Sequence, residues 1–125
     1  MIVGIGTDIV SIERIEAMLS RQGDAIARRI LADQEWQQFQ TANQPAAFLA
    51  KRFAAKEAPA KAFGTGSRDC LSLQHIIVTN NEMGQPAIHF EDRAAELATQ
   101  LNIQQHHISL SDEQSYAIAY VILEK

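Results

Sequence analysis

The stretch that organises the chain is Arg52-Phe53-Ala54-Ala55-Lys56-Glu57-Ala58-Pro59-Ala60-Lys61-Ala62-Phe63-Gly64-Thr65-Gly66. It predicts the end of a helix that runs from about Ala46 to Phe63 and stops at Gly64, because glycine often follows the last helical residue. Glu57 and Lys61 are four residues apart and therefore share one helical face. Such a pair can hold a metal ion and a phosphate together, or it can be a surface ion pair. The spacing leaves both interpretations open.

Length and composition indicate an ordinary globular protein. The 125 residues are enough for one domain with its own core, which we expect to span residues 1–125. The apolar share is 46% and the charged share is 21%, values that are typical of soluble proteins. A formal net charge of −4 gives no reason to expect nucleic acid as a partner.

The compartment is predicted from features that the sequence lacks. It contains no run of eighteen apolar residues, which a membrane-spanning helix would need. The first residues do not combine a basic region with an apolar stretch, as a secretory signal would. Cys70 is the single cysteine and has no partner for an internal disulfide. We therefore expect a reducing, cytoplasmic environment.

A first strand is predicted from Ile2 to Ile9. Alternation places Gly4, Gly6 and Asp8 on one face of this strand. The glycines leave space beside the carboxylate, into which backbone or a ligand can come close. Asp8 is a candidate functional residue for this reason. Its alternative role is to accept hydrogen bonds from the following helix.

A basic helix is expected next, with Ser11 as its N-cap. Arg14, Arg21 and Arg28 recur every seven residues, which concentrates positive charge in an otherwise acidic protein. This pattern is compatible with a solvated helix face. It is also compatible with a docking surface for an acidic partner, whose encounter it would accelerate.

The rest of the chain predicts further short helices and two strand hairpins. Both faces of the last strand are apolar, so both should be covered, and another subunit could provide one cover. Pro59 cannot donate to the Ala55 carbonyl and is expected to bend the long helix without moving Glu57. The remaining expected elements are short helices capped by Asp24 and Asp33, hairpin strands at His75–Thr79 and Ala87–Phe90, a helix at Glu91–Leu101, and hairpin strands at His107–Ser111 and Ser115–Leu123.

Four motifs in this order resemble the holo-acyl-carrier-protein synthase family, the small phosphopantetheinyl transferases of bacterial fatty acid synthesis. Each motif alone is weak, but together they cover nearly the whole chain and are highly specific. The motifs are Gly4-Ile5-Gly6-Thr7-Asp8-Ile9-Val10, Arg52-Phe53-Ala54-Ala55-Lys56-Glu57-Ala58 with Lys61-Ala62, Gly64-Thr65-Gly66, and Gly84-Gln85-Pro86.

The resemblance implies a transferase that moves 4′-phosphopantetheine from coenzyme A to a serine of apo-acyl carrier protein. The other product is adenosine 3′,5′-bisphosphate. It also implies an α+β fold, with helices packed on a small, mostly antiparallel sheet, and a homotrimer with active sites between subunits. Asp8 and Glu57 correspond to the magnesium-binding carboxylates, and Lys61 corresponds to the lysine near the transferred phosphate. Mg²⁺ suits two carboxylates because it prefers hard oxygen ligands and keeps several waters.

The resemblance also assigns binding residues. Arg14 corresponds to a basic position on the helix that receives the carrier protein, and Arg21 and Arg28 extend that surface. The positions implied for coenzyme A are Arg52, Lys61, Gly64, Thr65, Gly66 and Pro86.

The sequence departs from the pattern after Ser111, where many relatives have histidine and this chain has Asp112. A role of that histidine in base catalysis or phosphate contact does not carry over to Asp112. Glu57 is one candidate for the base that takes the serine proton, and the sequence does not separate base from metal ligand.

Two other classes of protein fit some of these residues. A coenzyme A-binding regulator would use the same pocket but would need no paired carboxylates. A magnesium-dependent nucleotide pyrophosphatase would use the carboxylates, but it would transfer to water and need no basic docking helix.

Overall fold

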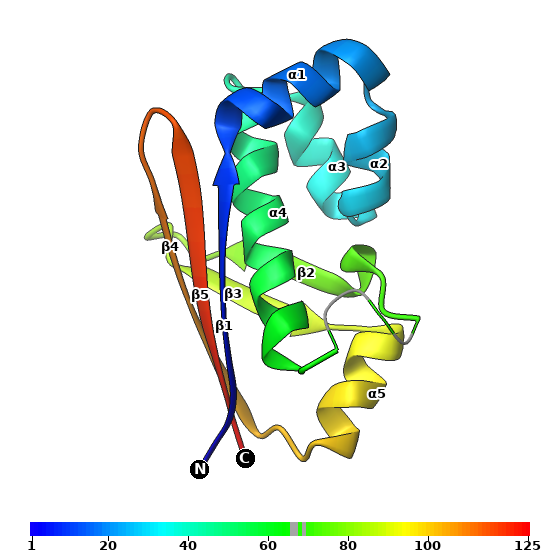
Figure 1. Ribbon diagram of the computed structural model, residues 1–125, viewed down its shortest axis with the longest axis vertical. Coiled ribbons are helices and arrows are strands. Elements are labelled where there is room, and N and C mark those ends of the chain that lie inside the picture. Colours follow the sequence, from blue (N-terminus) through cyan, green and yellow to red (C-terminus); the bar gives the residue numbers. More distant parts are fainter. Residues whose placement is uncertain (66–67, 69) are drawn as a thin grey trace.

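A computed structural model describes residues 1–65, 68 and 70–125, and it has the α+β architecture that the sequence predicts (Figure 1). Strands β1 (Ile2–Ser11), β5 (Tyr116–Glu124) and β4 (Gln105–Asp112) form an antiparallel sheet in that order. The two chain ends meet in this sheet, where the Met1 ammonium donates to the carbonyl of Lys125. The predicted hairpin of the last two strands is confirmed.

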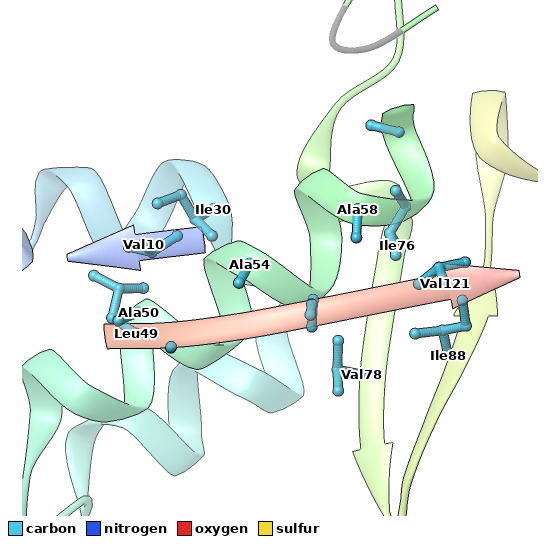
Figure 2. Packing of buried hydrophobic residues seen from close by; sticks show 14 of the residues in the cluster. Val10, Ile30, Leu49, Ala50, Ala54, Ala58, Ile76, Val78, Ile88 and Val121 are labelled. Atoms are coloured by element: carbon cyan, nitrogen blue, oxygen red, sulfur yellow. The ribbon is translucent and has the colours of Figure 1, made fainter. Parts of the chain in front are cut away.

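A second antiparallel hairpin packs beside the first sheet. It consists of β2 (Ile76–Asn80) and β3 (Pro86–Phe90), within a residue of the predicted bounds. Gly84 in the connecting turn has a φ of 82°, a conformation that glycine adopts without steric cost. Ile76, Val78 and Ile88 point from this hairpin into the core (Figure 2).

Helix α4 (Pro45–Ala62) lies across the inner face of the three-stranded sheet (Figure 1). On that face the small side chains of Ala117 and Ala119 are fully buried, which lets the helix lie close to β5. The helix continues through Pro59, and the amide of Phe63 donates to the Pro59 carbonyl at 2.9 Å. It ends one residue before the predicted end, and Gly64 follows with a φ of 86°.

Smaller helices close the two ends of the molecule (Figure 1). Helices α1 (Ile12–Gln22), α2 (Ala25–Ile30) and α3 (Asp33–Gln40) gather at one end; the short helix η1 (Leu73–His75) precedes β2; and α5 (Asp92–Gln100) lies at the other end. Ser11 caps α1 as predicted by accepting from the amide of Arg14.

The predicted caps of the next two helices need correction. Asp24 occupies the N-cap position of α2, but its side chain makes no capping hydrogen bond. Asp33 is the first residue of α3 rather than its cap, and Ala32 takes the cap position. The reason is Glu35, whose carboxylate accepts from the amide of Ala32 at 2.9 Å and satisfies the helix start from within.

Glu35 also forms the centre of a buried charge cluster with Lys56 and Arg52. The Lys56 ammonium lies 2.5 Å from one carboxylate oxygen and also donates to the carbonyls of Leu73 and Ile76. Arg52 donates to the other oxygen and to the carbonyl of Val78. These two cations of α4 therefore connect α3, α4 and β2 inside the protein.

The outer face of the three-stranded sheet remains exposed in the single chain. Its apolar side chains are contributed by β1 and β5: Ile5 (56% exposed), Ile9 (61%), Tyr116 (47%), Ile118 (41%) and Tyr120 (45%). Register places Ile5 opposite Ile122 and Ile9 opposite Ile118, so the residues form one continuous patch. The expectation that both faces of the last strand are covered is thus met on one face only within the single chain, where α4 covers Ala117 and Ala119. Among the described helices, none has the length and apolar content that a bilayer span needs.

Candidate active site

The candidate site lies where β1 meets α4. The ammonium of Lys61 donates to Asp8 Oδ1 at 2.7 Å and to the carbonyl of Thr7 at 3.1 Å. Half of the Lys61 side chain is exposed, so this ion pair faces solvent rather than the core. Asp8 is therefore bound by a lysine of α4 and is not the cap of the helix that follows it, a role that Ser11 fills.

Glu57 lies beside the same pair. Partial burial raises the pKa of Glu57 above its usual value, the carboxylate of Asp8 raises it further, and the ammonium of Lys61 opposes both effects. The two carboxylates are thus close enough to repel each other. The bend of α4 at Pro59 that leaves Glu57 in place stays a prediction.

A pocket of about 320 Å³ opens in front of these carboxylates. Its polar side chains are Asp8, Ser11, Arg14 and Glu57, and it is shared by β1, α1 and α4. One wall is apolar and consists of Ile9, Val10, Ile15, Met18 and Phe53. The pocket therefore combines a negatively charged end, one arginine and an apolar surface.

The apolar wall was not singled out from the sequence as part of a site. Ile15 belongs to the helical stripe that predicts core packing, and Phe53 to the apolar side of the long helix. Nothing in their spacing distinguishes a pocket wall from a core, since both require the same residue types. The packing of α1 against α4 is what places Ile15 and Phe53 beside the pocket.

The positions implied for coenzyme A are spread over three places. Gly64 and Thr65 follow α4 directly, and the amide of Gly64 donates to the carbonyl of Lys61. Pro86 starts β3 and is half-buried. Gly66 lies outside the described residues. Arg52 is buried, and its guanidinium is hydrogen-bonded to Glu35, Val78, Gln38 and Asn80; its contact with coenzyme A stays a prediction.

The three predicted docking arginines lie on α1 and α2 and are exposed. Arg14 borders the pocket with the carboxylates. The guanidinium of Arg28 stacks over the ring of Trp36, with Cζ 3.9 Å from the ring centroid. The exposed arginines thus give α1 and α2 a positively charged surface, and Arg14 brings one of these charges to the edge of the pocket.

The donor set fits a magnesium ion. Asp8 and Glu57 supply oxygen ligands, and a cation between them would relieve their mutual repulsion. Among the residues that the structure describes, no group of three or more histidine, cysteine, aspartate or glutamate side chains could hold a metal. Two carboxylates with the remaining positions left to water and phosphate oxygens is the arrangement that Mg²⁺ commonly adopts.

Comparisons with known proteins agree with this architecture. Residues 4–121 match the family model of the 4′-phosphopantetheinyl transferase superfamily. Holo-[acyl-carrier-protein] synthases of Yersinia enterocolitica and Pectobacterium carotovorum are each 53% identical over 123 residues, which is 98% of this chain and 98% of theirs.

Solved structures show the same fold. The holo-[acyl-carrier-protein] synthase of Neisseria meningitidis superposes with a TM-score of 0.94 at 42% identity, covering 100% of both chains. The Helicobacter pylori enzyme, solved in complex with coenzyme A, superposes with a TM-score of 0.83 at 32% identity, covering 96% of this chain and 99% of that one.

The fold and these relatives thus define a transferase of the phosphopantetheinyl type. The chain belongs to the 4′-phosphopantetheinyl transferase superfamily.

Proposed function

We propose that this chain transfers 4′-phosphopantetheine from coenzyme A to a serine hydroxyl of an apo-acyl carrier protein, with Mg²⁺ held by Asp8 and Glu57. The relatives' names and the coenzyme A complex of the Helicobacter pylori enzyme support the reaction class. The observation that carries the proposal is that Asp8 and Glu57 line one pocket while Lys61 forms an ion pair with Asp8.

The reaction forms a bond between the serine oxygen and the β-phosphorus of coenzyme A and breaks the bond from that phosphorus to the bridging oxygen. Adenosine 3′,5′-bisphosphate leaves with the bridging oxygen and its electron pair. Lys61 donates hydrogen bonds to phosphate oxygens, which stabilises the charge that builds up as the phosphoryl group moves. The Lys61 side chain is half exposed, so its ammonium can contact a substrate while it stays close to Asp8.

The serine proton must go to a base. Glu57 is one candidate to accept it, because its carboxylate lines the pocket beside Asp8. A magnesium ion in this position would supply charge neutralisation for the pyrophosphate and an activated water. Asp8 keeps Lys61 oriented toward the same place through their 2.7 Å ion pair.

Substrates are proposed to enter from different sides. The carrier protein docks on α1 and α2, where Arg14, Arg21 and Arg28 attract its acidic surface. Coenzyme A is held by Lys61, by the loop at residues 64–66 and by Pro86. The apolar wall of the pocket borders the docking helix, so the serine reaches the carboxylates from that side.

We propose a homotrimer in which the outer face of the β1-β5-β4 sheet is the contact between copies. A patch with Ile9, Ile118 and Tyr120 all more than 40% exposed is costly to leave in water. Apolar patches of this kind on a sheet mark interaction surfaces. The assembly would place each pocket beside a neighbouring subunit.

The test is a mass measurement on apo-acyl carrier protein mixed with coenzyme A, Mg²⁺ and the purified protein. A gain of about 340 Da on the carrier, the mass of the phosphopantetheine group, supports the transferase. Consumption of coenzyme A without a shift in carrier mass would instead indicate a pyrophosphatase. Binding of coenzyme A with no turnover would indicate a regulator.

A further inference from the structure

The face of β1 that carries Asp8 also carries Gly4 and Gly6, and both glycines lie against the backbone of α4. A Cβ atom at Gly6 would lie 1.9 Å from the carbonyl oxygen of Ala58, and one at Gly4 would lie 2.0 Å from the carbonyl oxygen of Ala62. In real proteins a Cβ atom essentially never lies within 3.0 Å of a heavy atom from outside its own residue and the two neighbouring residues. The obstacle is backbone in both cases, so no side-chain rotation can make room.

The spacing of the two contacts is regular. Two residues of a strand advance about 6.8 Å, and four residues of a helix advance about 6.0 Å. Gly6 and Gly4 therefore meet successive turns of α4, which runs alongside β1 in the opposite direction (Figure 1). The helix is seated on the strand at two points rather than one, which fixes both its distance and its tilt.

These two contacts between β1 and α4 lie next to the candidate site. Ala58 and Ala62 directly follow Glu57 and Lys61, so each glycine contact adjoins one functional residue. Helical side chains lean toward the N-terminus of their helix. From its position, Lys61 leans along the strand toward Asp8 and reaches it at 2.7 Å. A helix held farther from the strand would open this distance and the gap between Asp8 and Glu57 together.

We propose that Gly6, together with Gly4, is a positioning residue of the site: the missing side chain sets the separation of α4 from β1 and thereby the convergence of Asp8, Glu57 and Lys61. The inference rests on the proposed function for its kinetic consequence, but its geometric part is independent of that function. A methyl group at Gly6 would lie 1.9 Å from the carbonyl oxygen of Ala58 in the present backbone, so the helix would have to move away until this distance exceeds about 3.0 Å. A misplacement on the order of 1 Å can reduce turnover roughly 100-fold.

The test compares Gly6→Ala with Leu97→Ala, a buried-core variant on α5 that destabilises the fold away from the site. Crystal structures, thermal unfolding with and without Mg²⁺, and steady-state kinetics are measured on the full chain. For Gly6→Ala we expect the distance from Lys61 Nζ to Asp8 to lengthen beyond hydrogen-bonding range. The Mg²⁺ concentration for half-maximal stabilisation should rise about 10-fold, and kcat should fall while KM for coenzyme A stays close to the parent value.

Leu97→Ala should lower the melting temperature but leave the Mg²⁺ requirement and the Lys61–Asp8 distance unchanged. A Gly6→Ala protein with the parent distance and Mg²⁺ requirement overturns the proposal, and so does an equal change in Leu97→Ala. If Gly6→Ala does not fold, Gly4→Ala is the second variant, at the neighbouring turn of α4. We expect it to lengthen the Lys61–Asp8 distance and raise the Mg²⁺ requirement as well. If the parent protein transfers nothing to the carrier, the proposed function fails, while the structures of both variants still decide the positioning role.

Discussion

Lys61 and Asp8 are separated by 53 positions in the sequence, yet their side chains form an ion pair of 2.7 Å at the junction of a strand and a helix. This ion pair connects the lysine that we propose to bind phosphate with a proposed metal ligand. It also makes the lysine a point charge with a defined position, which is what stabilisation of a phosphoryl transition state requires.

Replacing this lysine should affect turnover more than substrate binding. We expect Lys61→Ala to lower kcat by about 10² to 10³, since one preorganised contact to developing charge is lost. KM for the carrier protein should change little, because docking depends on other residues. Steady-state kinetics with both substrates varied separately measure this split. Lys51→Ala is the control, because this lysine lies on the same helix but makes no ion pair with Asp8; a comparable loss of kcat there would contradict a specific role of Lys61.

Glu57 should make the stability of the metal-free protein depend on pH. Its folded-state pKa is raised above the usual 4.5, first by burial and then by Asp8. The folded protein therefore binds the proton more tightly than the unfolded chain does, and stability falls as pH rises from about 4.5 through the raised pKa. Glu57→Gln removes this loss, so the variant should be the more stable of the two at pH 7 and lose that advantage near pH 4.

The measurement is denaturant unfolding of parent and Glu57→Gln with a chelator present, at several pH values. Added Mg²⁺ should then stabilise the parent protein and not the variant, because the variant lacks one carboxylate ligand. A stability difference that grows as the pH is lowered would contradict the raised pKa. Equal Mg²⁺ stabilisation of both proteins would contradict Glu57 as a ligand.

The buried cluster around Glu35 should be important for stability. Glu35→Gln leaves Lys56 and Arg52 inside the protein without their carboxylate, which typically costs about 3–5 kcal/mol in the free energy of unfolding. A domain of this size has a total stability of only about 5–15 kcal/mol. Urea unfolding measures the loss. Asp33→Asn, which removes an exposed carboxylate in the first turn of the same helix, should cost less than about 1 kcal/mol.

Charge reversal on α1 should separate docking from coenzyme A binding. We expect Arg14→Glu to raise KM for the carrier protein and to weaken the salt dependence of association, since rim charges act mainly on encounter. The affinity for coenzyme A, measured by calorimetry, should stay the same. Arg93→Glu on α5 supplies a matched charge change away from the docking helices. Equal loss of carrier and coenzyme A binding in Arg14→Glu would show a general disturbance of the pocket.

A charge on the outer sheet face should dissociate the proposed homotrimer. Ile118→Asp introduces a carboxylate at the centre of the exposed apolar patch, where burial between copies would be strongly unfavourable. Sedimentation equilibrium should report a trimer for the parent protein and a monomer for the variant. Gln37→Asp, at an exposed position of α3, should remain trimeric. A parent protein that sediments as a monomer would contradict the assembly outright.

The order of elements could be predicted from the sequence because the signals are local. The alternation of β1, the apolar positions of α1 and α5, the Asn-rich turn before Gly84 and the glycine after α4 each depend on neighbours within a few residues. The shared helical face of Glu57 and Lys61 is local in the same way. The family motifs then linked these local features to a reaction, through resemblance rather than through spacing.

Other features were decided by tertiary contacts. Lys56 and Arg52 have the sequence context of surface cations, and only the arrival of Glu35 from α3 makes them buried partners. Asp33 has the chemistry of a helix cap, but the Glu35 side chain satisfies the helix start instead.

By itself, the sequence determined which residues of this protein carry charge, where most of its helices and strands run, and which side of β1 carries the two glycines beside Asp8. It did not determine whether backbone or ligand fills the space beside Gly4 and Gly6. The fold places α4 there. The physical reason is that local periodicity sets the direction of a side chain, whereas the distance between two elements depends on every atom packed between them.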